Sequence, residues 1–214
     1  MEGVESKKDL ANYLKQHFNG LALREPLFFS WTNALRFDLQ NGEPSSEDYF
    51  KEVDKRSSAL FEAIFRQTED VFVIYIEYKW KRRKIRFSNY CFKQINALKR
   101  TDIDYFVVRH LYEKQKDDIY NIAITKVKAI DINHKNVLKA IANTDFPPRE
   151  PRFKFLNNPN IYFINISRNV IFHMYDDRGL DIIASDINIL KPIYQKYNSW
   201  ILNTNREHID KIMA

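Results

Sequence analysis

Apolar side chains recur along this chain with two periods, and each period predicts a type of secondary structure. Spacings of three and four residues, as in Leu10, Tyr13 and Leu14, are typical of helices that bury one face. Runs of β-branched and aromatic residues, such as 71–80, predict strands. We expect helices at 5–18, 47–66, 133–143, from 185 onward with a break near Pro192, and at 205–213, and strands at 26–39, 71–80, 104–112, 119–127, 161–166, 170–176 and 180–184.

This order of elements predicts an α+β fold with a mixed, mostly antiparallel sheet on which helices pack. Short turns separate the last three strands, so we expect a C-terminal three-stranded meander followed by a helix. The length of 214 residues suits one domain over 1–214, with an N-terminal portion 1–130 and a motif-bearing portion 131–214. Three prolines predict an extended segment over 145–152. The segment 86–100 fits neither pattern clearly.

The densest group of charges lies at 173–181, around the turn between the last two strands. Gly179 lies in this turn, and a glycine there predicts a backbone at positive φ. His173 and neighbouring carboxylates suit a divalent cation or acid–base chemistry. Alternatively, turn carboxylates bind their own backbone, and Arg178 pairs with Asp176 or Asp181. Both interpretations stay open at this point.

The proline-rich segment carries two arginines that can join the carboxylates of the turn in one ion-pair network. Tyrosine and arginine are also common anchors of protein interfaces. If these side chains are exposed, they form a surface for a protein partner. The candidate partner-binding residues are Tyr175, Asp176, Asp177, Arg178, Asp181, Arg149 and Arg152.

A second charged segment, 79–86, contains six basic residues among eight. Basic side chains that contact phosphates, together with a ring that stacks on a base, are typical of nucleic-acid binding. A solvated loop, or an edge strand protected from aggregation by its charge, gives the same pattern. The candidate nucleic-acid-binding residues are Trp80, Lys81, Arg82, Arg83, Lys84 and Arg86.

Composition excludes several functions and favours acidic partners. The chain has 34 basic and 28 acidic residues, a formal net charge of +6, and only four glycines. The glycine-rich loops of P-loop ATPases and Rossmann dehydrogenases are missing, as is the nucleophile elbow of α/β-hydrolases. The single Cys91 excludes cysteine-rich zinc sites. We expect a cytoplasmic protein with no cofactor, no metal and no membrane segment, whose partner is another, acidic protein or a nucleic acid.

Four segments carry a resemblance to a known family: Ile141–Pro147, Tyr162–Asn165, His173–Asp181 and Tyr197–Leu202. They resemble a bacterial family that is catalogued only as a domain of unknown function, and weaker likeness extends to most of the chain. The resemblance implies no activity. By analogy with small Gram-positive proteins that neutralise toxins, an immunity protein is one form of the expected binding protein.

These observations lead to three hypotheses. The first is a non-enzymatic protein-binding module, with an immunity protein as one form. The second is a nucleic-acid-binding protein that uses the basic segment 79–86. The third is a metal-dependent hydrolase built on His173, Asp176, Asp177 and Asp181.

Overall fold

Seven strands form one sheet in the computed structural model, which describes residues 6–44, 46–79, 81, 83–112, 118–153 and 159–214. The strand order is β1-β7-β6-β5-β2-β4-β3, and every neighbouring pair is antiparallel. This confirms the predicted α+β class. The strands are β1 (Ala34–Asp38), β2 (Asp70–Tyr78), β3 (Asp104–Arg109), β4 (Ile119–Lys128), β5 (Asn160–Asn165), β6 (Val170–Met174) and β7 (Gly179–Ala184).

Helices cover both faces of this sheet. The described helices are α1 (Ser6–Phe18), α2 (Glu47–Ile64), α3 (Tyr90–Lys93), α4 (His134–Ala142), α5 (Ile187–Lys196) and α6 (Arg206–Met213). Polar caps start several of them: the Ser46 hydroxyl accepts from the Tyr49 N–H, and Asn133 and Asp186 cap α4 and α5 in the same way. None of the described helices is long and apolar enough to cross a membrane.

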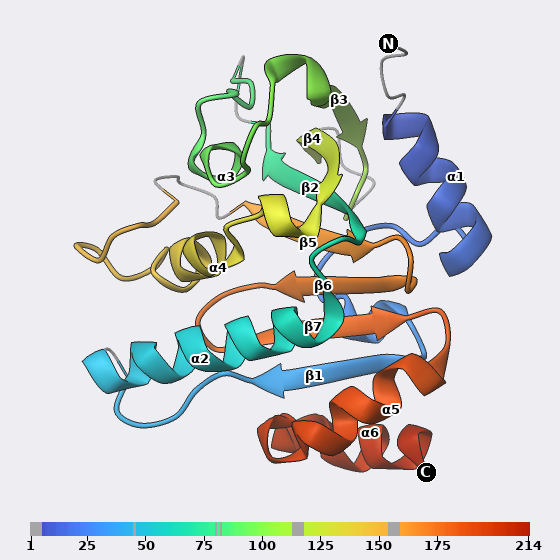
Figure 1. The fold of residues 1–214 in the computed structure, drawn as a ribbon, viewed down its shortest axis with the longest axis vertical. Helices are drawn as coiled ribbons and strands as arrows, with labels where there is room; N and C mark the ends of the chain where they lie inside the picture. The colour runs from blue at the N-terminus through green and yellow to red at the C-terminus, as the bar shows by residue number, and fades with distance from the viewer. Residues whose placement is uncertain (1–5, 45, 80, 82, 113–117, 154–158) are drawn as a thin grey trace.

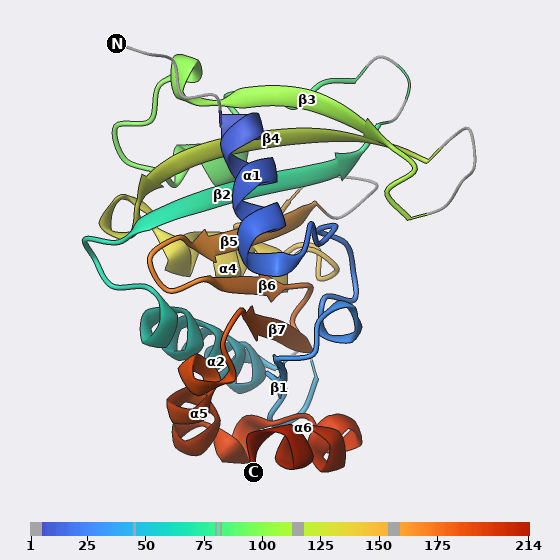
Figure 2. The same ribbon diagram turned by 90° about the vertical axis from the view of Figure 1, so that its right-hand side faces the viewer.

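The two faces of the sheet are buried by different elements. α2 and α4 lie in front of the sheet in Figure 1, where Phe61 of α2 packs edge-to-face on Phe163 and Phe172. α1 lies against the other face, where Tyr13 meets Phe72, and the segment 20–33 runs beside it (Figure 2). We call these the α2 face and the α1 face.

The C-terminal helices close one edge of the sheet. α5 and α6 lie beyond β1 (Figure 1), Phe37 forms an isolated bridge with Ile201, and the Leu202 N–H donates to the Arg36 carbonyl. β3 forms the opposite edge, and its side chains alternate between half-buried and exposed. The two ends of the sheet therefore differ, because one is covered and the other is open.

Two segments differ from their predictions. Only Ala34–Asp38 of the expected strand 26–39 is a strand, because Phe28–Ser30 forms a short 3-10 helix that packs on the sheet. The prediction of an extended segment at 145–152 is wrong. There the Phe146 N–H donates to the Asn143 carbonyl and the Arg149 N–H to the Phe146 carbonyl, which makes successive turns.

Candidate functional site

A row of polar side chains crosses four neighbouring strands on the α1 face. Register pairs Arg36 of β1 with Asp181 of β7, and Asp181 with His173 of β6. His173 is in turn paired with Tyr162 of β5. Directly paired residues of antiparallel strands point to the same side, so the four side chains form one row. We call Arg36, Asp181, His173 and Tyr162 the polar ladder.

Asp181 is the centre of the polar ladder and has no exposed side-chain surface. Arg36 donates from Nε to Oδ1 at 2.7 Å and from Nη2 to Oδ2 at 2.9 Å. The Phe28 N–H also donates to Oδ2, at 2.9 Å. Charge-assisted, bidentate bonds of this kind are the strong ones. They hold the segment around Phe28 onto the sheet, so Asp181 stabilises the fold.

The guanidinium of Arg36 is also surrounded by aromatic rings. It lies 5.1 Å from the ring centre of Phe28, 5.0 Å from that of Phe29 and 5.6 Å from that of Tyr175. Contacts of this length are within the range of cation–π attraction. Phe29 differs from the other two because it is 68% exposed. It is the most exposed large apolar side chain among the described residues.

His173 lies fully buried in the polar ladder, stacked on Tyr162 at 4.2 Å between ring centres. Its Nε2 is 3.4 Å from Glu25 Oε1, but neither ring nitrogen is aligned for a hydrogen bond with a described residue. Burial, and then the charge of Arg36, lower the His173 pKa to about 3. Burial, with the charges of Asp176 and Asp181, raises the Glu25 pKa to about 7. His173 is therefore neutral near pH 7 and forms no true ion pair.

The other carboxylates of the 173–181 segment bind different partners. Arg178 Nε donates to Asp176 Oδ2 at 2.8 Å, and the Arg178 N–H donates to Asp176 Oδ1 at 2.8 Å. The Tyr49 hydroxyl of α2 donates to Asp177, which connects the turn to the α2 face. Asp176 and Asp177 are buried. The turn is thus pinned by its own side chains, as the second of the two interpretations predicts.

Gly179 is required for a different reason from the one we expected. Its φ lies outside the left-handed region, so the prediction of positive φ is wrong. A Cβ at this position would lie 2.1 Å from the Tyr175 hydroxyl oxygen and 2.7 Å from the Phe37 carbonyl oxygen. Close approach of the neighbouring strand therefore selects glycine here.

The two arginines of the proline-rich segment bind elsewhere. Arg149 donates to both carboxylate oxygens of Glu47 on α2, at 2.6 and 3.1 Å, and its guanidinium lies 3.9 Å from the ring centre of Phe50. Arg152 Nε is 3.5 Å from Glu150. These contacts anchor the segment to α2 and to itself.

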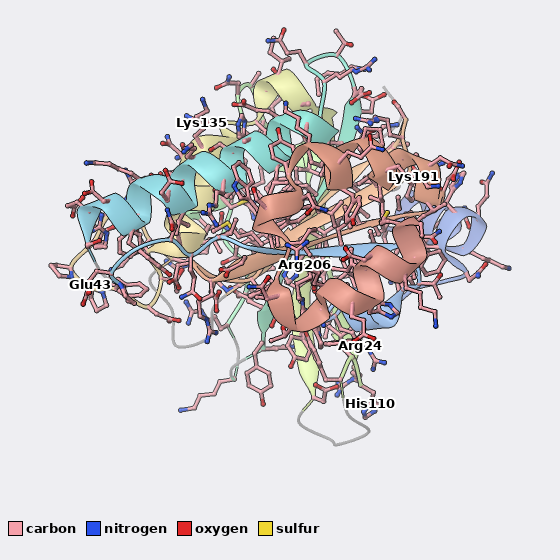
Figure 3. All side chains as sticks on the ribbon, turned by 90° about the horizontal axis from the view of Figure 1, so that it is seen from below. Arg24, Glu43, His110, Lys135, Lys191 and Arg206 are labelled. Carbon is pink, nitrogen blue, oxygen red and sulfur yellow. The ribbon has the colours of Figure 1, made fainter. Side chains whose placement is uncertain are left out.

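Figure 3 places Lys135 of α4 and Arg24 of the segment 20–33 on opposite sides of the molecule.

The residues of the hydrolase hypothesis point in different directions. His173 and Asp181 belong to the polar ladder, whereas Asp177 binds α2 and Asp176 binds Arg178. Among the described residues, no group of three or more His, Cys, Asp or Glu side chains could hold a metal ion. The carboxylates of the motif thus serve separate contacts.

A basic groove of about 1010 Å³ lies at the open end of the sheet. Lys79, Lys81 and the residues 83–88 line one side, and β3 and β4 supply Tyr105, Val107 and Asn121. Register pairs Asn121 with Val107 and with Glu77 of β2, so this groove lies on the α2 face. Its basic side chains are Lys79, Lys81, Arg83, Lys84, Arg86 and Arg100.

Charge and exposure distinguish the basic groove from the polar ladder. No carboxylate is among the described residues that line it. Lys84, Arg86 and Arg100 are exposed and form no ion pair within the described part of the chain. Phe87, Tyr105 and Val107 are 37%, 42% and 43% exposed beside these cations. The predicted residues Trp80 and Arg82 lie outside the described residues.

Sequence reasoning missed the partners that only the strand order reveals. Arg36 precedes Asp181 by 145 positions, Glu25 lies still earlier in the chain, and no motif links either residue to the turn. For the groove, the sequence identified the basic segment 79–86 as a candidate but did not identify Arg100 or Tyr105, which also line it. The residues of 104–109, Asp-Tyr-Phe-Val-Val-Arg, do not alternate between polar and apolar, so no sequence pattern marked Tyr105 as exposed.

The fold and the groove define a basic α+β protein with a seven-stranded antiparallel sheet. A family model described as "Domain of unknown function (DUF3885)" matches residues 10–205, and the chain belongs to this family. The resemblance noted in the sequence is thereby confirmed. An "Uncharacterized protein YnaE" of Bacillus subtilis (strain 168) is 28% identical over 209 residues, which cover 90% of this chain and 97% of that protein. No solved structure matches the chain.

Proposed function

We propose that this protein binds single-stranded nucleic acid in the basic groove. One observation carries the proposal: six Lys and Arg side chains line one groove together with exposed rings, and no described lining residue is acidic. Basic side chains attract phosphates and release their counterions, which supplies affinity without sequence preference. The cytoplasmic location that the sequence predicts fits such a ligand.

The exposed rings favour a single strand over a duplex. Phe87 and Tyr105 offer faces on which unpaired bases stack, at about 1–3 kcal/mol per base. Bases within a duplex are already stacked on one another. Lys84, Arg86 and Arg100 then contact the phosphates, because no described residue that lines this groove is acidic.

Fluorescence anisotropy with a labelled single-stranded oligonucleotide tests this proposal. We expect binding that weakens steeply between about 50 and 200 mM salt, by roughly tenfold or more for several phosphate contacts. The same strand in a duplex binds more weakly. Absence of binding at the lower salt concentration, or binding that does not change with salt, would overturn the proposal.

Protein binding, with an immunity protein as one form, is a second candidate, and one observation favours it. Phe29 is 68% exposed beside Arg36 and the half-buried Tyr175. An exposed ring next to arginine is a common interface anchor. The surface differs from the one expected, because Asp176, Asp177 and Asp181 are buried. Affinity capture with the wild type and Phe29→Ala, after nuclease treatment, tests this second candidate. A protein that the wild type retains and the variant loses supports it. If no such protein is found, the result counts against it.

A further inference from the structure

A second cavity, of about 610 Å³, adjoins the basic groove and has a polar floor. It shares Arg83, Lys84 and Arg86 with the groove, and β2 adds Tyr75 and Glu77. We call this cavity the side pocket. Because the same cations border both cavities, a strand lying in the groove passes the mouth of the side pocket.

Two buried polar atoms at this pocket have no hydrogen-bond partner among the described residues: Glu77 Oε1 and Asn89 Nδ2. One is an acceptor and the other a donor. Glu77 as a whole is 8% exposed. Most buried polar atoms in proteins are paired, so an orphan acceptor and an orphan donor at one cavity indicate a missing ligand.

The surrounding contacts fix how both groups are oriented. The Tyr75 hydroxyl lies 3.5 Å from Glu77 Oε2, which leaves Oε1 as the unpaired oxygen. Asn89 Oδ1 accepts from the Phe92 N–H at 3.0 Å as the cap of α3, which assigns Nδ2 to the opposite side of the amide. Asn121 Nδ2 donates to the Arg83 carbonyl at 3.0 Å, which holds the backbone at Arg83 against β4. Neither orphan group is free to turn away.

An acceptor and a donor that line one cavity are the two kinds of group that the edge of a nucleobase can pair with. A carboxylate accepts from the amino group of cytosine, and an asparagine amide donates to the acceptor atoms of a base. Thymine has no amino group, and its N3–H lies between two carbonyl oxygens that repel a carboxylate. A carboxylate beneath a basic rim therefore suits a ligand that is anionic at its phosphate and a donor at its base.

We propose that the side pocket takes one base of the bound strand and selects bases with an exocyclic amino group. Glu77 Oε1 accepts from the amino group, and Asn89 Nδ2 donates to the neighbouring acceptor of the base. Glu77 Oε1 and Asn89 Nδ2 each have less than 1 Å² of exposed surface, so a base must displace side chains at the rim as it enters. Lys84 and Arg86 lie at this rim and are exposed, so they can move aside. The inference rests on the proposed function, because the groove must first bind the strand.

The test compares labelled homopolymers of deoxycytidine, deoxyadenosine and thymidine at one salt concentration. The wild type binds the first two about tenfold more tightly than the third, as one matched base contact predicts. Glu77→Gln removes the charge that repels thymine and adds an N–H that donates to its carbonyl oxygens, so thymidine binding rises and the ratio falls toward one. Asp70→Asn, at the far end of β2 and paired with Lys128, keeps the wild-type ratio and is the matched control.

The outcomes separate the two proposals. If no homopolymer binds, the proposed function itself fails. If all three bind equally to the wild type, the groove binds nucleic acid and the base selection by the side pocket is overturned. Equal loss of all three in Glu77→Gln, with a lower thermal midpoint, overturns the base-reading role in favour of a structural one. A preference for thymidine overturns it as well.

Discussion

The two halves of the sheet use charged side chains in opposite ways. On β1, β7, β6 and β5, three members of the polar ladder are fully buried, and Arg36, whose side chain is 12% exposed, is paired with Asp181. On β2, β4 and β3, the basic groove carries exposed cations, and no described lining residue is acidic. Removing one partner of a buried ion pair is strongly destabilising, whereas an exposed cation is available to a ligand. The two charge-dense segments of the sequence, 173–181 and 79–86, thus differ in role: the first is structural and the second is the candidate ligand site.

The largest expected effect comes from removing the charge at the centre of the polar ladder. Asp181→Asn leaves the Arg36 guanidinium, whose side chain is only 12% exposed, without its counter-charge, so we expect a loss of about 3 kcal/mol in the free energy of unfolding. Urea denaturation measures it. Asp48→Asn, which removes one partner of an exposed pair with Lys51, is the control and leaves the midpoint unchanged. A loss below about 1 kcal/mol for Asp181→Asn would show that the ladder is not structural.

The close approach at Gly179 predicts the next effect. Gly179→Ala places a Cβ against the Phe37 carbonyl and the Tyr175 hydroxyl, so we expect a destabilisation of about 3 kcal/mol. Tyr175→Phe removes one of the two clashing oxygens, and the double variant therefore recovers part of the loss. Denaturant midpoints of the three variants test this. Equal stability of Gly179→Ala and the wild type would contradict the strand contact.

The buried His173 predicts an acid-sensitive contribution to stability. Its folded pKa of about 3 lies below the ordinary value of 6.5, so the unfolded state binds more protons between these pH values. Its stabilisation is therefore complete above pH 6.5 and falls as the pH falls, by about 2 kcal/mol at pH 5. His173→Phe keeps the stacking on Tyr162 and removes this loss.

Glu25 acts in the opposite direction and provides the control. Its folded pKa of about 7 lies above its ordinary value of 4.5, so its contribution is present below pH 4.5 and is lost as the pH rises through 7. We expect Glu25→Gln to become more acid-sensitive than the wild type, whereas His173→Phe becomes less so. The measurement is the slope of the thermal midpoint against pH between pH 5 and pH 7 for the wild type and both variants. Identical slopes in both variants would show that neither group titrates as described.

The smallest expected loss of stability is that of Arg178→Ala, which changes the arginine of the 173–181 motif. The Arg178 side chain is 68% exposed, and its partner Asp176 lies in the same turn. Arg178→Ala should cost less than about 1 kcal/mol, because exposed ion pairs contribute little. Urea denaturation at two salt concentrations measures this. A loss comparable to that of Asp181→Asn would mean that the turn, rather than the polar ladder, stabilises this half of the sheet.

Local patterns predicted most elements of this fold. The spacing of apolar residues in 47–66 and 133–143 predicted α2 and α4, and the apolar runs predicted β2 and the C-terminal meander. The failures have identifiable causes. At 26–30 Phe28 is buried from a 3-10 turn whereas Phe29 is exposed, so the aromatic character of this segment does not reflect strand pairing. At 145–152 local hydrogen bonds form turns that proline content alone does not predict.

The candidate sites were less predictable, because they depend on strand order. Nothing in the sequence places Arg36 beside Asp181, since β1 and β7 are adjacent only in the folded sheet. Likewise, Glu77 and Asn89 face one cavity because α3 packs near β2, where the Tyr75 and Phe92 rings are 5.9 Å apart. The basic segment was predictable because its six cations are consecutive or nearly so.

The central claim is that the exposed charges of Lys84, Arg86 and Arg100 in the groove, and not those of the motif, bind the ligand. The most direct test measures oligonucleotide affinity for Lys84→Ala/Arg86→Ala and for Arg178→Ala in parallel, with thermal midpoints for both. We predict that the groove variant loses about tenfold or more in affinity and about two units of salt dependence at unchanged stability, while Arg178→Ala binds like the wild type. Undiminished binding by the groove variant, together with loss of binding by Arg178→Ala, would contradict this account.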